Sequence, residues 1–409
     1  MISKFNLTDI LSKILIVFIC FLPISLVLSI FVSELILIII IINFLILNYF
    51  NKDSREIYKT NFLKIFILFW LLLIVSSLLS ESINTSIRTS FFYFRFGFLV
   101  LVIKYLLDHE KKFAKYFFLS LGITLLVLSI YTFLQITIFK NAFDPNRISG
   151  LFGEELVQGS YLIRMLPIFF GLMYMTDIIK AKNKLLLVSI FIGIFLIIFS
   201  GERSSVASLG ILLFFSLIFF PINLYKKILS IITISVFIIF LITFFDNVQN
   251  RIIKSTMKTM FENNKIMVFS YGHQSHYLSA LKMIKNNFFI GIGPRNFREE
   301  CKKKDYEYIG KYRCSTHPHN TYLEIFAETG IFGFLSILAL FLYTINCLIK
   351  LILKNNETKY TSFFFFNIAI FVNIFPFLPT GSFFNNWMSF LYYLPIAFFL
   401  YERQKLAIK

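Results

Sequence analysis

The residues best suited to chemistry lie in the segment 317–333, His-Pro-His-Asn-Thr-Tyr-Leu-Glu-Ile-Phe-Ala-Glu-Thr-Gly-Ile-Phe-Gly, at the start of a long apolar stretch. Asn320 is suited to cap a helix here, because its side chain accepts hydrogen bonds from backbone amides without helical partners. His319 precedes it, and an imidazole with a pKa near neutrality can take a proton from a hydroxyl group. His319 is therefore a candidate catalytic base, with His317 and Asn320 as candidate substrate-binding residues. The other interpretation is that His319 only braces the helix entry.

Arginines form a second group of candidates. Arg95, Arg164 and Arg203 fall at one depth, at or near the outer ends of predicted membrane helices, and Arg88 and Arg147 lie just above them. An arginine inside a membrane span costs at least a few kcal/mol, so a shared depth is informative. Each one alone can extend to lipid headgroups. Together they predict an anion site, because paired guanidinium donors match the oxygens of a phosphate or diphosphate.

Membrane helices must position these residues. Of the 409 residues, 57% are apolar, and the mean hydropathy of +0.77 is far above that of soluble domains. Apolar runs of about 17 to 25 residues, each able to cross about 30 Å of hydrocarbon, recur along the chain. The pattern predicts an all-α polytopic integral membrane protein with about 12 transmembrane helices. They are expected at 13–29, 31–50, 62–80, 91–107, 116–139, 160–175, 185–200, 204–222, 228–245, 331–353, 362–379 and 387–401.

The positive charge sets the orientation. The formal net charge is +18, but lysine and arginine gather in every second gap between apolar runs, which argues against a nucleic-acid partner. This positive-inside pattern predicts that both termini are cytoplasmic. The first apolar run is followed by a second almost at once and by no small-residue cleavage site, so we expect it to remain as a membrane helix rather than a signal peptide.

One long polar segment lies outside. The predicted organisation is helices 1–9 with short loops in 1–245, a large periplasmic loop in 246–321, and helices 10–12 in 322–409. The loop is basic, which suggests an anionic partner. Tyr277, Leu278, Leu281 and Ile284 have the spacing of an amphipathic helix near the headgroups. The helix that starts at Asn320 is longer than a span needs, so its first turns are expected on the outer surface, with a bend at Gly330.

The cysteines, and the absence of metal and nucleotide motifs, restrict the kinds of reaction that this chain can catalyse. Cys301 and Cys314 both fall in the outer loop, where a bacterial envelope is oxidising, so a disulfide between them is expected, with two unpaired thiols as the alternative. Cys20 and Cys347 fall in or beside membrane helices. We find no metal-ligand spacing and no glycine-rich nucleotide loop, and we therefore expect no metal and no cofactor.

Several motifs together resemble one family. His319-Asn320, with Gly330 and Gly333 at their spacing, resembles the histidine motif of the O-antigen ligase and O-antigen polymerase superfamily of bacterial envelopes. Further matches are Arg147-Ile-Ser-Gly-Leu-Phe-Gly, Ser200-Gly-Glu-Arg-Ser, and the stretch 280–297. The resemblance covers about 147–353. It departs in one place, because His273 occupies a position where many members carry an arginine. A histidine there can still bind phosphate, or Arg251, Lys254 or Lys282 can replace the arginine.

The resemblance implies a metal-independent glycosyltransferase or ligase at the periplasmic face of the bacterial inner membrane. The donor would be a glycan on undecaprenyl diphosphate, held by Arg203 with Arg95, Arg147, Arg164 and His273, while His319 activates the acceptor hydroxyl. A ligase would use lipid A-core as acceptor, and a polymerase a second lipid-linked repeat; the spacing of the histidine motif favours the ligase. Membrane lipids are the other expected partner.

Two other classes of function stay open. A transporter or flippase of lipid-linked saccharides would also be polytopic and basic, but it would more often place its charges near the membrane midplane in interrupted, repeated helices. The clustering of the arginines at one face favours an enzyme. A scaffold without catalytic activity would make Arg203 and His319 dispensable.

Overall fold

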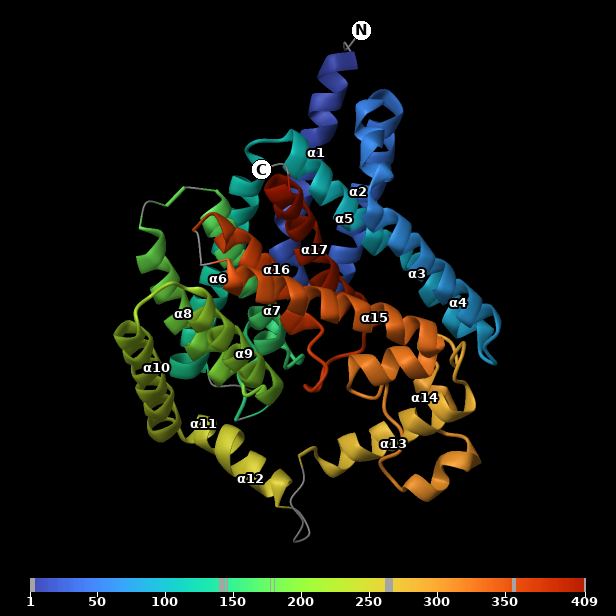
Figure 1. Cartoon of the computed structure of the whole chain (residues 1–409). Coiled ribbons are helices and arrows are strands. Elements are labelled where there is room, and N and C mark those ends of the chain that lie inside the picture. Colours follow the sequence, from blue (N-terminus) through green and yellow to red (C-terminus); the bar gives the residue numbers. More distant parts are fainter. Residues whose placement is uncertain are drawn as a thin grey trace.

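The protein is helical throughout its described residues, with no strand among them. The structure is a computed structural model that describes residues 4–139, 144, 146–176, 178–179, 181–261, 268–354 and 358–407. The helices are α1 (Lys4–Leu28), α2 (Ile30–Phe50), α3 (Asn61–Leu78), α4 (Ile83–Phe92), α5 (Phe94–His109), α6 (Phe113–Leu134), α7 (Gln158–Met175), α8 (Lys182–Phe199), α9 (Arg203–Phe219), α10 (Leu224–Phe244), α11 (Asp246–Val248), α12 (Ser255–Met260), α13 (Tyr271–Asn286), α14 (Phe297–Glu300), α15 (Thr321–Leu353), α16 (Thr361–Asn373) and α17 (Asn386–Ala407) (Figure 1). Short 3₁₀ or π turns are η1 (Asp53–Lys59), η2 (Gln135–Phe139), η3 (Gly150–Phe152), η4 (Gln249–Lys254), η6 (Lys304–Ile309) and η7 (Thr358–Tyr360).

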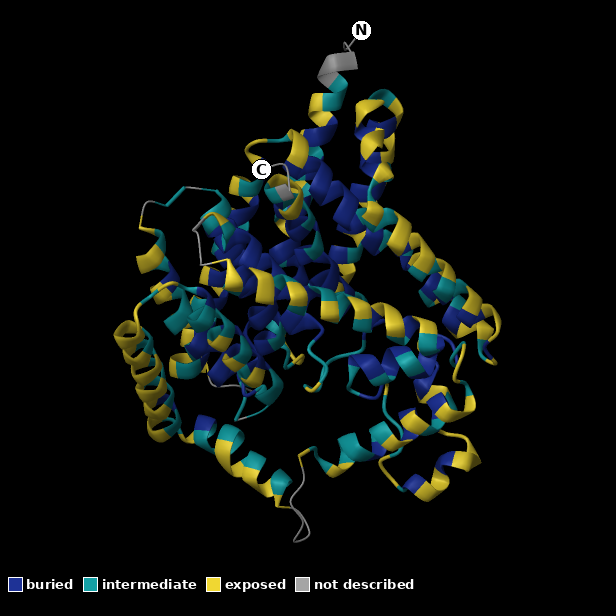
Figure 2. Ribbon diagram, in the orientation of Figure 1, coloured by how far each residue is buried: buried dark blue, intermediate teal, exposed yellow. Residues whose placement is uncertain are grey.

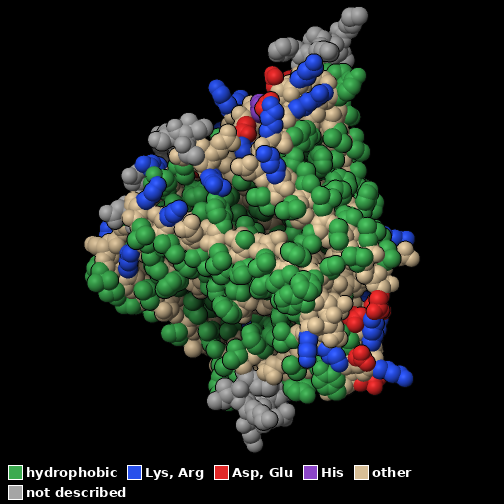
Figure 3. Space-filling view, turned by 45° about the vertical axis from the view of Figure 1, so that its right-hand side comes forward, with side chains coloured by type: hydrophobic (Ala, Val, Ile, Leu, Met, Phe, Trp, Pro, Cys, Tyr) green, Lys and Arg blue, Asp and Glu red, His purple; other side chains and the backbone are tan. Residues whose placement is uncertain are grey.

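The surface between the two ends of the molecule is apolar. Figure 3 shows a broad hydrophobic band with lysine and arginine gathered beyond it at both ends. Many large apolar side chains in this band are exposed, among them most of those on α10. In water such a surface would be strongly unfavourable, whereas lipid chains solvate it. The fold is therefore that of a polytopic membrane protein.

The number of spans is only partly tested. Each of the twelve predicted ranges overlaps a helix, and among the described residues eight helices are long and apolar enough to cross a membrane. α9 and α16 are apolar but shorter. α7 and α17 carry polar residues and an internal proline each, Pro167 and Pro395, and most of their side chains are packed inside the protein. The count of twelve stays a prediction.

The helix predicted at 91–107 begins earlier than expected and is interrupted. α4 starts at Ile83 and α5 follows after Tyr93. The Trp70 indole N–H donates to the Ser90 carbonyl at 2.8 Å, so this carbonyl is used by a neighbouring helix at the interruption. The apolar pattern carries no signal for this break, because Trp70 lies in α3, 20 residues away.

The buried core lies where α5, α7, α16 and α17 meet, and Figure 2 shows the buried residues concentrated there. It is rich in aromatic side chains. The rings of Phe219 and Phe364 are stacked with centroids 4.1 Å apart, which fixes α9 against α16. The core sits beside the histidine motif and gives the site a rigid support.

The outer segment has its own small core. Buried apolar side chains of α13 and of the turns after it pack together and against the first turns of α15: Ala280, Met283, Ile284, Ile292, Phe297, Tyr306, Ile309 and Ala327. The amphipathic helix expected near Tyr277 is confirmed as α13. The bend expected at Gly330 is also confirmed, because its φ of 70° and ψ of −167° interrupt α15.

Candidate functional site

Asn320 and the loop before α17 fix the backbone of the histidine motif. The Asn320 side chain accepts hydrogen bonds from the amides of Tyr322 (3.0 Å) and Leu323 (3.1 Å), so the predicted N-cap is confirmed. Its amide group donates to the Pro376 carbonyl at 2.7 Å, and the Thr380 amide donates to the His319 carbonyl at 3.0 Å. These bonds hold His319 at a φ of 58°, a left-handed conformation that is uncommon outside glycine and concentrates at functional sites.

Four of the five histidines of the chain form one cluster. The His319 ring lies between His317, His273 and His276, with ring centroids 4.1, 5.1 and 5.4 Å away. His273 and His276 come from α13, where their spacing of three residues places them on one face of the helix. Within the described residues, no group of three or more potential ligands is arranged to hold a metal ion. The cluster is thus a set of imidazoles in mutual contact.

This environment favours the neutral form of each imidazole. Burial and then the neighbouring His317, His273 and His276 lower the pKa of His319 to about 3. Burial lowers the pKa of His317 to about 4, although its hydrogen bond to the Thr380 backbone opposes the shift. A neutral imidazole keeps one lone pair, so His319 offers a proton-accepting nitrogen at physiological pH, and its lowered pKa makes it a weaker base than a free imidazole.

Arginines gather at the turn between α8 and α9. Gly201, at a φ of 67°, forms this turn, and a Cβ there would lie 2.8 Å from Arg147 Cγ and 3.0 Å from Arg251 Cγ. Arg147 donates from Nε to the Ser200 carbonyl at 3.4 Å, and Arg251 donates from Nε to the Gly201 carbonyl at 3.1 Å. Arg203 is the next residue but one, and its charge acts on both Arg147 and Arg251. Three arginines therefore gather at this turn, and two of them contact the glycine.

Glu202 balances part of this charge and fixes the turn. Its carboxylate accepts hydrogen bonds from the amide (3.2 Å) and hydroxyl (2.7 Å) of Ser160 in the first turns of α7, and from the hydroxyl of Ser205 (3.2 Å). A carboxylate at a helix N-terminus is favourable. Three arginines and one carboxylate leave a net positive charge at the turn, which suits an anionic ligand.

His273 connects the arginines to the histidines. Burial and then the positive charge of Arg203 lower the pKa of His273, so the two side chains are near enough to interact electrostatically. Arg203 also donates to the Thr259 hydroxyl at 3.3 Å. The cationic turn and the histidine cluster are consequently parts of one site. The sequence leaves open whether His273 or one of Arg251, Lys254 and Lys282 takes the place of the family arginine, and of these four residues His273 is the one in ring contact with His319.

Arg164 of α7 is linked to the histidine motif through α17. The side chain is buried, donates to the Ser160 carbonyl at 2.9 Å, and its Nε has no hydrogen-bond partner in the described structure. It interacts with the Tyr392 hydroxyl, which lies 3.2 Å from the Thr321 hydroxyl. Thr321 follows the histidine motif directly, so Arg164 supports this motif through α17.

Arg95 belongs to a different environment. Its guanidinium forms an ion pair with Glu34 of α2, with Nε and the carboxylate oxygen 3.0 Å apart, and stacks over the ring of Phe96. No contact of the described residues links it to Arg203 or His319. The structure therefore gives Arg95 a partner within the helix bundle, and the expectation that it binds substrate has no structural support.

Two buried carboxylates attach the surrounding loops to α15. Glu324 accepts hydrogen bonds from the Ser382 hydroxyl (2.5 Å) and the Phe383 amide (2.8 Å), and Glu328 accepts from the amides of Arg295 (2.7 Å) and Phe297 (3.1 Å). Each carboxylate thereby fixes one loop beside the histidine motif. The sequence analysis gave no role to these residues, although their spacing of four along a helix places them on one face.

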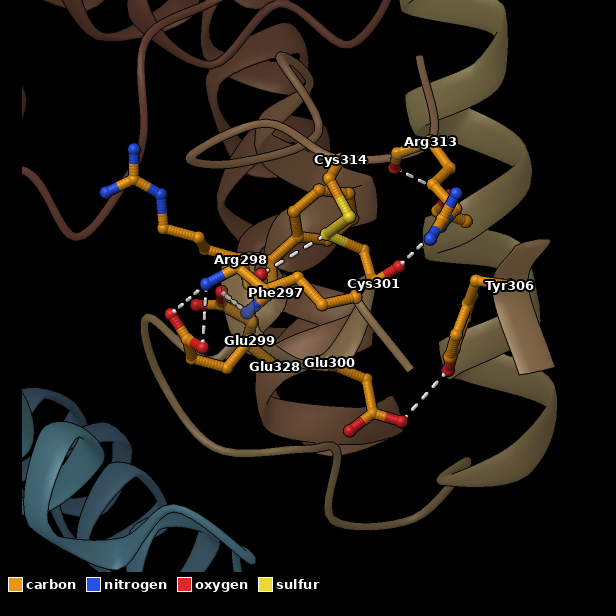
Figure 4. Close-up of a disulfide and its surroundings, with 11 residues drawn as sticks. Phe297, Arg298, Glu299, Glu300, Cys301, Tyr306, Arg313, Cys314 and Glu328 are labelled. Carbon is orange, nitrogen blue, oxygen red and sulfur yellow. Dashed lines mark hydrogen bonds and ion pairs between the residues drawn. A yellow bond between two sulfur atoms is a disulfide. The ribbon is translucent and has the colours of Figure 1, made fainter. Parts of the chain in front are cut away.

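A disulfide closes the outer segment. Cys301 and Cys314 are joined, as the sequence analysis expects, with Cα atoms 5.3 Å apart (Figure 4). Arg313 donates from Nε to the Cys301 carbonyl at 3.2 Å, and its own carbonyl accepts a hydrogen bond from the Ser279 hydroxyl of α13 at 2.8 Å. The disulfide therefore holds the loop that carries the histidine motif close to α13.

The fold and the site define a polytopic membrane protein with a surface centre of arginines and histidines. A family model described as O-antigen ligase matches residues 188–338, and this match confirms the resemblance to the O-antigen ligase superfamily. The matched region includes Arg203, Arg251 and all four clustered histidines, while Arg147 and Arg164 lie before it. No curated protein matches the chain. Residues 188–338 thus match an O-antigen ligase domain, which supports a function of the O-antigen ligase and polymerase type.

Proposed function

We propose that this chain transfers a glycan from an undecaprenyl diphosphate carrier to the lipid A-core saccharide, without a metal or cofactor. The observation that carries the proposal is that His273 contacts the ring of His319, with centroids 5.1 Å apart, and interacts electrostatically with Arg203. A cationic donor site and a base for the acceptor hydroxyl would then meet at one reacting bond.

The donor would be bound by its diphosphate. Arg203 and Arg251, with Arg147 behind them, supply guanidinium donors around the Gly201 turn. These arginines carry more positive charge than Glu202 alone can neutralise. A dianionic diphosphate would neutralise the remaining charge. Arg164 has an unpartnered Nε and is a further, more deeply buried contact. The proposed domain organisation agrees with this function, because the outer loop 246–321 supplies α13 and the two histidines of the histidine motif.

The transfer would be a single displacement, in which one bond forms as another breaks. The acceptor hydroxyl oxygen forms a bond to the anomeric carbon while the bond from that carbon to the diphosphate oxygen breaks. His319 takes the hydroxyl proton, and the electron pair of the broken bond leaves on undecaprenyl diphosphate. The arginines stabilise the negative charge that grows on this leaving group. The proton on His319 is then released to water or to the leaving diphosphate.

The orientation of the chain is the first prediction. Both termini lie at the end of the molecule opposite α11–α14 (Figure 1), which supports cytoplasmic termini and a periplasmic site in the inner membrane. Reporter fusions after Lys184, Lys227 and Lys359 are expected to read cytoplasmic, and a fusion after Lys304 periplasmic. A cytoplasmic reading at Lys304 would reject the proposed placement of the site.

The second prediction tests the function in cells. Deletion of the gene is expected to remove all long-chain lipopolysaccharide bands on a gel and to accumulate lipid-linked polymer. A single repeat on core would instead indicate the polymerase, and an unchanged pattern would reject both. Complementation with Arg203→Lys is expected to give about tenfold less long-chain product than wild type, because lysine keeps the charge but loses the planar fork that matches phosphate. Arg298→Lys, an exposed arginine of α14, is the matched control and should complement fully.

A further inference from the structure

The His319 ring has one hydrogen-bond partner among the described residues. Its Nε2 lies 3.2 Å from the Ser315 hydroxyl oxygen. Its Nδ1 has no hydrogen-bond partner among these residues. This atom is not fully buried, so it is accessible from the surroundings of the site. Imidazoles surround the ring elsewhere. Among the residues that the structure describes, no carboxylate is hydrogen-bonded to the ring to orient it in the way an aspartate orients the histidine of a serine protease.

His317 is held in one tautomer and has no free lone pair. Its Nε2 lies 3.2 Å from the Thr380 carbonyl oxygen, which can only accept, so Nε2 carries the proton. Its Nδ1 lies 2.8 Å from the Thr316 hydroxyl and therefore accepts a hydrogen bond from it. His317 cannot accept a proton without breaking one of these bonds. This argues against a direct substrate-binding role for His317 and leaves His319 as the histidine of the motif with an available nitrogen.

We propose that Ser315 is a positioning residue that accepts a hydrogen bond from His319 Nε2–H and thereby leaves the open Nδ1 as the base. A neutral imidazole has one N–H and one lone pair, so the partner of one nitrogen decides the chemistry of the other. If Ser315 donated instead, Nδ1 would carry the proton and could not act as a base. The inference deepens the proposed function and rests on it for the identity of the proton that Nδ1 removes.

The backbone on both sides of the Ser315–His319 contact is fixed. Thr380 fixes the His319 carbonyl, Asn320 caps α15, and the disulfide at Cys314 holds the residue before Ser315. Both ends of the Ser315–His319 contact are therefore fixed by separate interactions. The contact is a built feature of the loop rather than a chance approach of two free side chains.

Nitrogen NMR of protein labelled with ¹⁵N-histidine tests the tautomer directly. The chain has five histidines, and the His319 signals are those missing from His319→Asn. We expect wild type to show His319 with a protonated Nε2, Ser315→Ala to lose this single tautomer, and Ser315→Thr to keep it. Ser275→Ala is the control, because the Ser275 hydroxyl bonds the carbonyl of Tyr271 in its own helix. A protonated Nδ1 in wild type, or an unchanged tautomer in Ser315→Ala, would overturn the proposal.

Kinetics separate positioning from a structural role. Ser315→Ala is expected to lower kcat about tenfold with the KM for the donor nearly unchanged, and Ser315→Thr to restore most of it. The acid limb of kcat should move to lower pH in Ser315→Ala, because a hydrogen bond to the charged imidazolium is lost. An acid limb that moves to higher pH would show that Ser315 donates. Since the NMR measurement needs no glycan donor, it still decides the role of Ser315 if no transfer activity is found.

Discussion

Replacing His319 by asparagine is expected to lower glycan transfer about a hundredfold or more, as the loss of a general base commonly does. Asparagine tolerates the left-handed φ of this position better than alanine does, so the backbone should keep its conformation. Binding of the donor should survive, because the proposed diphosphate contacts are the arginines of the Gly201 turn. Purified protein with lipid-linked donor and acceptor would measure both binding and turnover, and thermal melting would check the fold.

The matched control is His109→Asn, which changes the one histidine outside the cluster. Near-normal turnover of a well-folded His319→Asn protein would show that the histidine is structural and only braces the helix entry. Loss of donor binding together with turnover would mean that His319 contacts the diphosphate. Either result contradicts the roles assigned to the two halves of the site.

The pH dependence gives a second measurement of the same residue. The pKa of His319 in the free protein is lowered to about 3 by burial and by the neighbouring histidines, so its base form persists as the pH falls. The plot of kcat/KM should therefore show no acid limb from this group between about pH 8 and pH 5. A bound diphosphate adds negative charge, which raises the pKa of the histidine in the complex. The acid limb of kcat should thus lie at higher pH than that of kcat/KM.

The sequence predicts features whose cause is local. The apolar runs define the membrane helices, because their length and composition suffice for that inference. The cap at Asn320 and the bend at Gly330 are also local properties of a few residues. The Cys301–Cys314 disulfide spans a short separation within one segment. The cap, the bend and the disulfide are found in the structure at their expected positions, whereas the helix predicted at 91–107 starts earlier and is interrupted.

The sequence does not predict contacts between distant segments. His273 and His276 meet His319 because α13 packs on α15, and nothing in the spacing of the three residues specifies this. The Arg251–Gly201 contact, 50 residues apart, is equally invisible. Arg95 was grouped with the site by its depth alone, but depth does not specify direction around a helix, and its side chain is paired with Glu34. The assembly of the site therefore depends on tertiary packing.

Two chain segments cross at Gly330, and their close contact predicts the effect of a substitution there. Phe289 and Ile290 pass so close to Gly330 that a Cβ there would lie 2.2 Å from the Phe289 carbonyl oxygen, and the φ of 70° disfavours any side chain. The Ile331 amide donates to the Phe288 carbonyl at 2.9 Å, and the Gly293 amide donates to the Glu328 carbonyl at 2.8 Å. These bonds join the stretch after α13 to α15 and hold the histidine motif in place.

Gly330→Ala is therefore expected to destabilise the outer segment by about 3 kcal/mol or more, because backbone atoms cannot yield as a flexible side chain does. The measurements are thermal melting in detergent and limited proteolysis between α12 and α15, where new cleavage should appear. Gly272→Ala is the matched control, since a Cβ at this helical position of α13 meets nothing within 4 Å. It should leave both readouts unchanged or raise stability by up to about 1 kcal/mol, because alanine favours helix over glycine. If Gly330→Ala melts and resists protease as wild type does, the segments do not cross as described, and the histidines of α13 lose the contact that brings them to His319.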